Sequence, residues 1–280
     1  MYFENDEGGI TVVDHTECRE EVSIPEKING LPVTRIAASA FRSCAKLKVA
    51  TLPDSVREIE PHAFSYCNKL TTVNLSQDLK TIGAEAFYYC EKLSDVALPP
   101  LLETLGDHAF DLCFGLESIH IPASVKNWGR DVFARTSIDT VTFEDGLETI
   151  GEGAFYNTKL TSFCLPQSMK RIEAHAFGNC LLLSSVTLNE GLLSVGKDVF
   201  KYDSVLVEIV IPASVSEIYD LTFNCCTNLK RAKFEGDAPD GYVTSDPENA
   251  VVGNRYTVYY HADAEGFTAP EWNGYETEIW

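Results

Sequence analysis

The sequence predicts an α/β repeat solenoid: a right-handed superhelix with a parallel β-sheet on one face, about ten rungs of 22–23 residues and a cap at each end. Three observations predict it. Nine phenylalanines, most of them preceded by alanine, recur 22 or 23 residues apart. An apolar alternation typical of a short strand follows each of them, and a proline, which has no N–H and ends a strand, often comes next. The nine are Phe41, Phe64, Phe87, Phe110, Phe133, Phe155, Phe177, Phe200 and Phe223.

One rung is clearest in residues 56–75, VREIEPHAFSYCNKLTTVNL. Counted from the phenylalanine as zero, position +3 is often cysteine, +6 leucine, +9 valine or isoleucine and +11 leucine or isoleucine. Positions +9 and +11 point inward, so +8 and +10 face outward on the sheet. The V-x-x-I step that follows is expected to point its apolar residues inward. The phenylalanine is the largest inward side chain, and its burial should contribute roughly 1.5–3 kcal/mol per rung.

The repeated pattern A-F-x-x-C-x-x-L-x-x-V-x-L-P-x-x-V-x-x-I runs from about residue 22 to residue 234. It resembles the BspA-like leucine-rich repeats over nearly the whole chain. The resemblance implies a leucine-rich-repeat superhelix. It also implies a secreted or surface-attached binding protein or adhesin, of the kind found in host-associated bacteria and some protozoa.

The chain divides into residues 1–40 as an N-terminal cap with the first rung, 41–234 as the repeat array and 235–280 as a C-terminal capping segment. In the first segment we expect strands at 10–13 and 21–25 and a turn at Asn29-Gly30. Terminal repeats are expected to be atypical, because one face has no neighbour.

The C-terminal segment contains a predicted strand at residues 255–260 and an aromatic tail. The tail includes Phe267, Trp272, Tyr275 and Trp280. We interpret it as a cap over the exposed edge of the last rung. The alternative is an aromatic platform for carbohydrate.

Six of the nine cysteines share the +3 position and should form a ladder of buried free thiols. The chain has no C-x-x-C pair of the kind that zinc sites use. The roles of Cys18, Cys164 and the Cys225-Cys226 pair stay open. Two shorter rungs have Thr136 and Thr158 in place of the cysteine, so their outer turn should differ. Trp128 stands where other rungs have isoleucine, and we expect it in the core. The ladder cysteines are Cys44, Cys67, Cys90, Cys113, Cys180 and Cys226.

Composition and motifs exclude several function classes. A net charge of −20 and a pI near 4.6 argue against binding nucleic acid or an anionic membrane. No apolar run reaches the length that spans a bilayer. His62, His108 and His175 fill a tolerant polar corner two residues before a phenylalanine. His120 faces outward without a triad or metal set around it. We find no catalytic, nucleotide-binding or calcium motif, and therefore predict no enzyme, no cofactor and no metal site.

The outward strand positions are the first candidate binding surface. They are small, polar and rich in serine and threonine, and they carry no aromatic residues. A solvated sheet explains this composition as well as a binding face does. The basic pair near the C-terminus is a local exception in an acidic chain. The candidate residues are Thr72, Asn74, Asp95, Ser118, His120, Thr140, Thr142, Ser185, Thr187, Arg231 and Lys233.

Aromatic residues just after the phenylalanines form a second candidate surface. They could make an exposed row on the outer wall, or they could pack between neighbouring rungs. The row consists of Tyr66, Tyr88, Tyr89, Phe114, Tyr156 and Tyr202.

These observations favour a non-enzymatic recognition protein that contacts a protein or extracellular-matrix-like partner through the strand face. One alternative is a glycan-binding or accessory module that uses Trp272 and Tyr275. Another is a cytoplasmic interaction scaffold. Residues 1–9 are acidic and lack the features of a signal peptide. A surface location therefore requires that a leader was removed.

Overall fold

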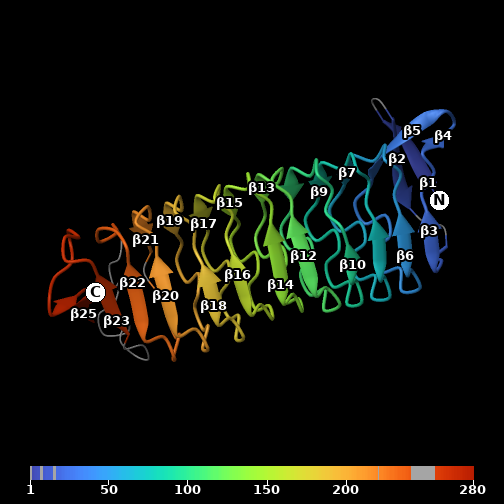
Figure 1. Ribbon diagram of the computed structural model, residues 1–280. Helices are drawn as coiled ribbons and strands as arrows, with labels where there is room; N and C mark the ends of the chain where they lie inside the picture. The colour runs from blue at the N-terminus through green and yellow to red at the C-terminus, as the bar shows by residue number, and fades with distance from the viewer. Residues whose placement is uncertain (1, 7–8, 15–16, 220, 241–255) are drawn as a thin grey trace. The chain divides into compact units, whose positions relative to one another are not determined.

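The computed structural model describes residues 2–6, 9–14, 17–219, 221–240 and 256–280. The chain divides into two compact units, residues 1–144 and 145–280. Each is a parallel β-solenoid whose successive rungs lie side by side (Figure 1). The residues that the structure describes form no helix, so the α/β part of the predicted class is not confirmed. The right hand of the coil stays a prediction.

The predicted outward-facing strands form parallel sheets in unit 1 (residues 1–144). Strands β3 (Glu21–Ser23), β6 (Val49–Thr51), β8 (Thr72–Asn74) and β10 (Asp95–Val96) are hydrogen-bonded in this order. Strands β12 (Ser118–Ile121) and β14 (Thr140–Phe143) make a second parallel pair. The register joins residues one repeat apart, as the period requires.

A second sheet, parallel except at its N-terminal end, was not predicted. Most of its strands come from the V-x-x-I step, which supplies a two-residue strand in each regular rung. The strands of this sheet are β1 (Tyr2–Asp6), β2 (Gly9–Asp14), β5 (Leu31–Ile36), β7 (Glu58–Ile59), β9 (Thr81–Ile82), β11 (Thr104–Leu105) and β13 (Asn127–Trp128).

The N-terminal cap has more strands than predicted. β2 and β3 confirm two predicted strands. β1 pairs antiparallel with β2, and β4 (Lys27–Ile28) pairs antiparallel with β5. The predicted turn joins β4 to β5, with φ of 53° at Asn29 and 83° at Gly30.

The turn around each phenylalanine forms the third side of a rung. The residues two before and two after every phenylalanine adopt positive φ. Backbone N–H groups of this turn donate to the next rung, as from Phe41 to the Ala63 carbonyl at 2.7 Å. The polar corner predicted around the histidines is therefore a left-handed backbone position. Before the phenylalanine these residues are Ser39, His62, Glu85, His108, Asp131, Gly153, His175, Asp198 and Leu221; after it they are Ser43, Tyr66, Tyr89, Leu112, Arg135, Asn157, Asn179, Tyr202 and Cys225.

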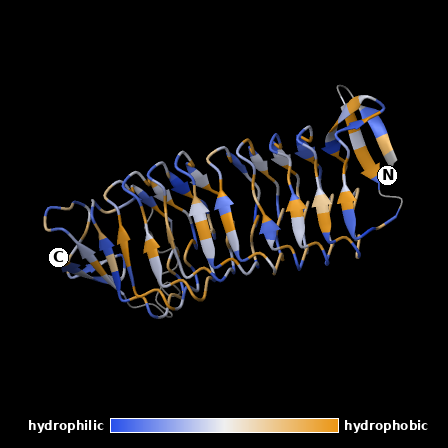
Figure 2. Cartoon of the chain, turned by 45° about the vertical axis from the view of Figure 1, so that its right-hand side comes forward, coloured by the Kyte–Doolittle hydropathy of each residue, from blue (hydrophilic) through white to orange (hydrophobic). Residues whose placement is uncertain are grey.

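The phenylalanines stack inside each unit, and all nine are buried, as predicted. In unit 1 the ring centroids are 5.0 Å apart between Phe41 and Phe64 and 5.3 Å apart between Phe110 and Phe133. Figure 2 shows the apolar residues that recur along the strands around this core. Trp128 fits the core only in part. It is half-buried, and its Nε1 is buried without an acceptor among the described residues.

Unit 2 (residues 145–280) repeats this plan. The two-residue strands β15 (Thr149–Ile150), β17 (Arg171–Ile172), β19 (Ser194–Val195) and β21 (Glu217–Ile218) form one sheet. On the other face β16 (Ser162–Cys164) pairs with β18 (Ser185–Thr187). A five-stranded sheet contains β20 (Glu208–Ile211), β22 (Arg231–Phe234), β23 (Thr257–Tyr260), β25 (Tyr275–Ile279) and β24 (Glu271–Trp272).

The aromatic tail is part of this last sheet and its packing. Trp272 is buried, with its ring 6.0 Å from that of Phe234 and 4.8 Å from that of Phe267. Tyr275 stacks on Tyr256 at 4.5 Å. The role of this segment as a cap stays a prediction. The predicted strand at 255–260 corresponds to β23, and residue 255 lies outside the described residues.

Candidate binding surfaces

The strand face of unit 1 is exposed where it was predicted to be. In β12 and β14, Ser118 lies opposite Thr140 and His120 opposite Thr142. All four are exposed, while Ile119 between them is buried. His120 Nδ1 lies 2.9 Å from Thr142 Oγ1. The result is a flat surface of short hydrogen-bonding side chains over an apolar layer.

The neighbouring sheet of unit 1 continues this polar character. Asn74 and Asp95 are exposed, and Thr72 is half-buried. The side-chain Nδ2 of Asn74 donates to Thr51 Oγ1 at 3.0 Å across two adjacent strands. Of the predicted residues, seven lie in unit 1 and four in unit 2, and each set is described by itself.

In unit 2, Ser185 and Thr187 are exposed on β18, opposite Ser162 and Cys164 of β16. Cys164 is a free, exposed cysteine on this face. The face again presents small hydrogen-bonding groups.

The predicted basic pair of unit 2 is already partnered. Glu208 accepts from Arg231 Nε at 2.5 Å and from Lys233 Nζ at 3.0 Å. These two hydrogen bonds, from Lys233 first and Arg231 second, lower the pKa of the Glu208 carboxyl. Lys233 also lies over the Trp280 ring at 5.2 Å. The two cations therefore form an ion cluster around one carboxylate. This makes them less available to an anionic partner.

Most of the cysteine ladder has the predicted form. Cys67 Sγ donates to the Phe41 carbonyl at 3.1 Å, one rung back, and Cys90 repeats this bond to Phe64 at 3.2 Å. Burial raises the pKa of the Cys90 thiol, so it stays protonated. In the shorter rung the Thr136 hydroxyl donates to Phe133 of its own rung at 2.9 Å. The outer turn therefore takes another form there, as predicted. The free ladder thiols are Cys67, Cys90, Cys113, Cys180 and Cys226.

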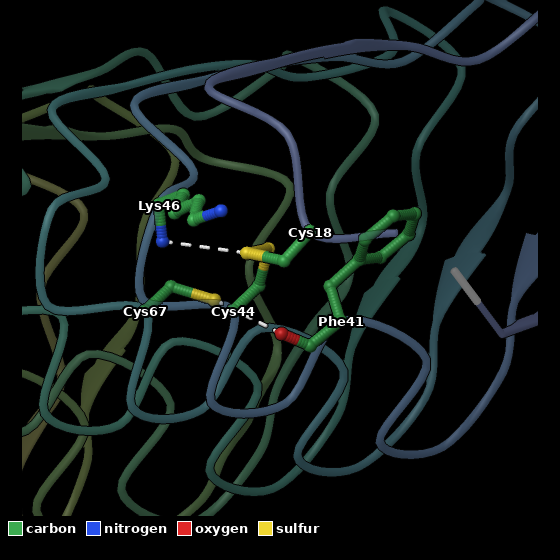
Figure 3. The surroundings of a disulfide bond; sticks show 5 residues. All are labelled: Cys18, Phe41, Cys44, Lys46 and Cys67. Atoms are coloured by element: carbon green, nitrogen blue, oxygen red, sulfur yellow. Dashed lines mark hydrogen bonds between the residues drawn. A yellow bond between two sulfur atoms is a disulfide. The ribbon is translucent and has the colours of Figure 1, made fainter. Parts of the chain in front are cut away.

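One ladder prediction is wrong: Cys44 is not a free thiol but forms a disulfide with Cys18 (Figure 3). Cys18 stands 23 residues before Phe41, which is the position that a phenylalanine of a preceding rung would occupy. The disulfide spans a separation of 26 residues, the same as the hydrogen bond from Cys67 to Phe41. At the first rung the disulfide therefore replaces the thiol–carbonyl bond. The 23-residue spacing was the signal in the sequence.

Asp203 takes the ladder position in its rung and is fully buried. Its Oδ1 accepts the backbone N–H of Cys180 at 2.8 Å, and its Oδ2 has no hydrogen-bond partner within the described residues. Burial raises the pKa of the Asp203 carboxyl to about 9. This acid is therefore neutral near pH 7 and takes the place of an uncharged thiol.

In the histidine corner, the ring of His108 lies against a buried acid. Asp111 is buried and accepts from Arg135 Nε at 2.9 Å, while His108 Nδ1 lies 3.1 Å from its other oxygen. The hydrogen bond with Asp111 raises the pKa of the Arg135 guanidinium. Across the described ranges, no three histidine, cysteine or acidic side chains are placed to hold a metal ion. The sequence did not single out Asp111, because its partner Arg135 comes from the next rung, 24 residues away, although His108 is only three residues away.

The aromatic residues of the predicted row that belong to unit 1 form a cluster. The Tyr66 ring lies 5.5 Å from Tyr88 and 5.6 Å from Tyr89, and Phe114 continues the row 6.2 Å from Tyr89. Tyr66 is 37% exposed and Phe114 is 46% exposed. The cluster thus packs between rungs and is also open to solvent. Tyr156 and Tyr202 of the predicted row lie in unit 2.

Comparison with known proteins places these features in a family. The model of the BspA type leucine rich repeat region, with 6 copies, matches residues 16–138 and 126–238. The chain belongs to the BspA-type leucine-rich repeat family. This is a family of repeat scaffolds, as the stacked rungs and buried phenylalanines led us to expect. None of the curated proteins matches the chain.

Solved leucine-rich repeat structures agree with the family. A leucine-rich repeat protein from Bacteroides ovatus ATCC 8483 is 26% identical, with a TM-score of 0.77 over 100% of this chain and 74% of that one. The T. pallidum leucine rich repeat protein is 28% identical, with a TM-score of 0.56 over 71% of this chain and 84% of that one. A leucine-rich repeat protein from Eubacterium ventriosum ATCC 27560 is 20% identical, with a TM-score of 0.54 over 92% and 76%, and it is similar in fold alone.

Proposed function

We propose that this BspA-type protein is a non-enzymatic recognition protein, secreted or displayed at a bacterial surface, and that it binds a protein partner through its strand face. The observation that carries the proposal is the polar outward face of two neighbouring sheets, one with β8 and β10 and one with β12 and β14. Its residues Ser118, His120, Thr140 and Thr142 are held in register on a rigid layer. Solenoids commonly bind through such extended surfaces.

Short polar side chains suit this role for two reasons. They lose little conformational entropy when a partner covers them. They also offer both donors and acceptors close to the backbone, so a partner can approach the sheet closely. The described residues include no apolar helix of membrane-spanning length.

The glycan alternative is weakened where it used Trp272. That ring is buried against Phe234 and Phe267 and is closed to a sugar. Trp272→Ala should destabilise the C-terminal sheet rather than remove a ligand contact.

A binding assay against a panel of purified extracellular-matrix proteins tests the proposal. The variant Thr72→Ala/Asn74→Ala/Ser118→Ala/His120→Ala should lose at least about tenfold in affinity for any bound partner, equivalent to about 1.4 kcal/mol. Its melting temperature should stay near that of the parent, because three of the four side chains are exposed and Thr72 is only half-buried.

The second sheet supplies a matched control. Thr81, Thr104 and Asn127 occupy its outward strand positions in the same unit. Alanine at these three sites should leave binding unchanged. If the control variant loses affinity as much as the strand-face variant, or neither loses it, the strand face is not the binding surface.

A further inference from the structure

Three lysines form a row on one edge of unit 1. Lys46, Lys69 and Lys92 all stand five residues after a phenylalanine, in three consecutive rungs, and all are exposed. Adjacent rungs are joined by parallel strand pairing, which sets them about 4.8 Å apart. The row is therefore a regular line of charge on a rigid backbone.

No ion pair joins these lysines to a described acid, although the chain is rich in acids. Acidic residues number 42 against 22 lysines and arginines. Some other cations pair with an acid across a rung, as Lys48 does with Glu20 at 2.9 Å and Lys80 with Glu103 at 3.1 Å. In the described part of the chain, no acid lies within ion-pair distance of any member of the row. Glu20 lies near enough to interact with two of them: the pKa of its carboxyl is lowered first by the hydrogen bond from Lys48 and also by the charges of Lys69 and Lys46. The row thus keeps three ammonium groups outside ion pairs, and Glu20 offsets part of their charge.

The aromatic cluster lies beside this row. Tyr66 and Tyr89 each stand three residues before a lysine of the row. Arg42 lies over the Tyr66 ring at 5.8 Å and adds a further cation. Glu91 hydrogen-bonds Tyr89 and raises the pKa of that hydroxyl, so this carboxylate is directed to the tyrosine. We name the combined surface the lysine–tyrosine edge, consisting of Arg42, Lys46, Tyr66, Lys69, Tyr89, Lys92 and Phe114.

We propose that the lysine–tyrosine edge binds a sulfated polysaccharide. Exposed aromatic rings offer apolar faces and edges on which sugar rings can rest, and tyrosine adds a hydroxyl for hydrogen bonding. Lysine acts as a compact point charge with rotatable donors, whereas the planar fork of arginine matches carboxylates. A row made mainly of lysines therefore fits dispersed sulfate esters better than the carboxylates of an acidic peptide.

The negative charge of the whole chain does not prevent this contact. At physiological ionic strength the Debye length is about 8 Å, so distant acids are largely screened. The lysines would touch the sulfates directly. Binding should therefore persist near 0.15 M salt and weaken at higher salt, because both the contact and counterion release depend on ionic strength.

Titration of the full chain with a heparin octasaccharide tests the proposal. The variant Lys46→Ser/Lys69→Ser/Lys92→Ser should lose at least about tenfold in affinity. The matched variant Lys27→Ser/Lys126→Ser/Lys197→Ser removes the same charge from exposed sites elsewhere and should keep the affinity within about twofold. Tyr66→Ser/Tyr89→Ser should also weaken binding, which charge attraction alone would not produce.

Three outcomes overturn the proposal: no binding of the octasaccharide, equal losses in both lysine variants, or tighter binding of a polyglutamate peptide of the same charge. The last would assign the edge to an acidic peptide. The strand-face variant described above should bind the octasaccharide like the parent. The two proposals therefore succeed or fail separately.

Discussion

The corner residues on either side of each phenylalanine hold a backbone conformation that most of them disfavour. A left-handed φ costs an ordinary L-residue roughly 1–2 kcal/mol, and glycine avoids that cost. Eight of the eighteen corners carry glycine, asparagine, aspartate or histidine, which tolerate it best, such as Gly153 and Asn157. Hydrogen bonds to the neighbouring rung hold this conformation. For example, the N–H of Ser43 donates to the Ser65 carbonyl of the next rung at 2.8 Å.

Ser43 allows a direct test, because its φ is 58° and its side chain is exposed. We predict that Ser43→Val lowers the free energy of unfolding by about 1 kcal/mol or more, since a β-branched residue fits a left-handed position worst. Ser43→Gly should be at least as stable as the parent. Urea denaturation of the three proteins measures the difference. Equal stability of the valine and glycine variants would show that the corner is not strained.

Asp203 predicts a pH dependence of stability. Its folded pKa of about 9 lies above the unfolded value of about 4. Below pH 4 the carboxyl is protonated in both states. Between these values only the unfolded state ionises, so the parent loses stability as pH rises, by at most about 1.4 kcal/mol per pH unit.

Asp203→Asn removes this titration and keeps the side-chain shape. Its stability relative to the parent should increase from pH 4 to pH 9 and then level off. The exposed Asp263→Asn is the control and should show no such trend. Thermal unfolding over this pH range gives the comparison. A constant difference between Asp203→Asn and the parent would mean that the buried acid ionises normally.

The elements differ in how well their residues predict them. The strands of the outward face alternate buried and exposed side chains, as in Ser118–Ile121, and this two-residue period can be recognised in the sequence. A two-residue strand such as Glu58–Ile59 carries no period, and its partners are a full repeat away. The second sheet therefore could not be predicted from local pattern, although the inward-facing apolar residue of its two-residue strands was predicted.

The candidate binding surface also combines features that a local pattern predicts with features that it does not. Exposure at +8 and +10 follows from the alternation. The pairing of Arg231 with Glu208 depends on a contact between rungs, yet the two residues are 23 positions apart. Comparison of residues one repeat apart would have found this pair and the lysine row, and the Cys18–Cys44 bond lies one repeat plus three residues apart. Reading each rung separately could not find them.

The phenylalanine stack is the element with the largest predicted effect. The Phe87 ring lies 5.2 Å from that of Phe64 and 5.1 Å from that of Phe110. We predict that Phe87→Ala lowers the free energy of unfolding by about 3–5 kcal/mol, because a full rung of apolar contacts is lost and a cavity remains. The exposed Ser118→Ala should change it by less than about 0.5 kcal/mol. Chemical denaturation distinguishes them, and a Phe87→Ala loss as small as the control would remove the stack from the core.

Over a whole unit, stability should be set by neighbouring rungs and by the ends. In repeat proteins each rung contacts only its neighbours, so the total is close to a sum of rung and interface terms. Unit 1 begins with an irregular cap of β1, β2, β4 and β5, and unit 2 ends with an aromatic-rich sheet. These ends protect sheet edges that would otherwise be free to pair with another chain.

The Cys18–Cys44 disulfide anchors the beginning of unit 1 and gives a test of this description. Closing a loop of 26 residues should stabilise the fold by about 3 kcal/mol, so Cys18→Ser/Cys44→Ser should lose about that amount. Because rungs couple to their neighbours, hydrogen exchange should show β3 and β6 losing protection most and β10 least. Cys67→Ser, which lies one rung further in and makes no disulfide, should not produce that gradient. An equal loss of protection across all strands of unit 1 would mean that the unit unfolds as a single cooperative block, and that the disulfide stabilises it without acting as a local anchor.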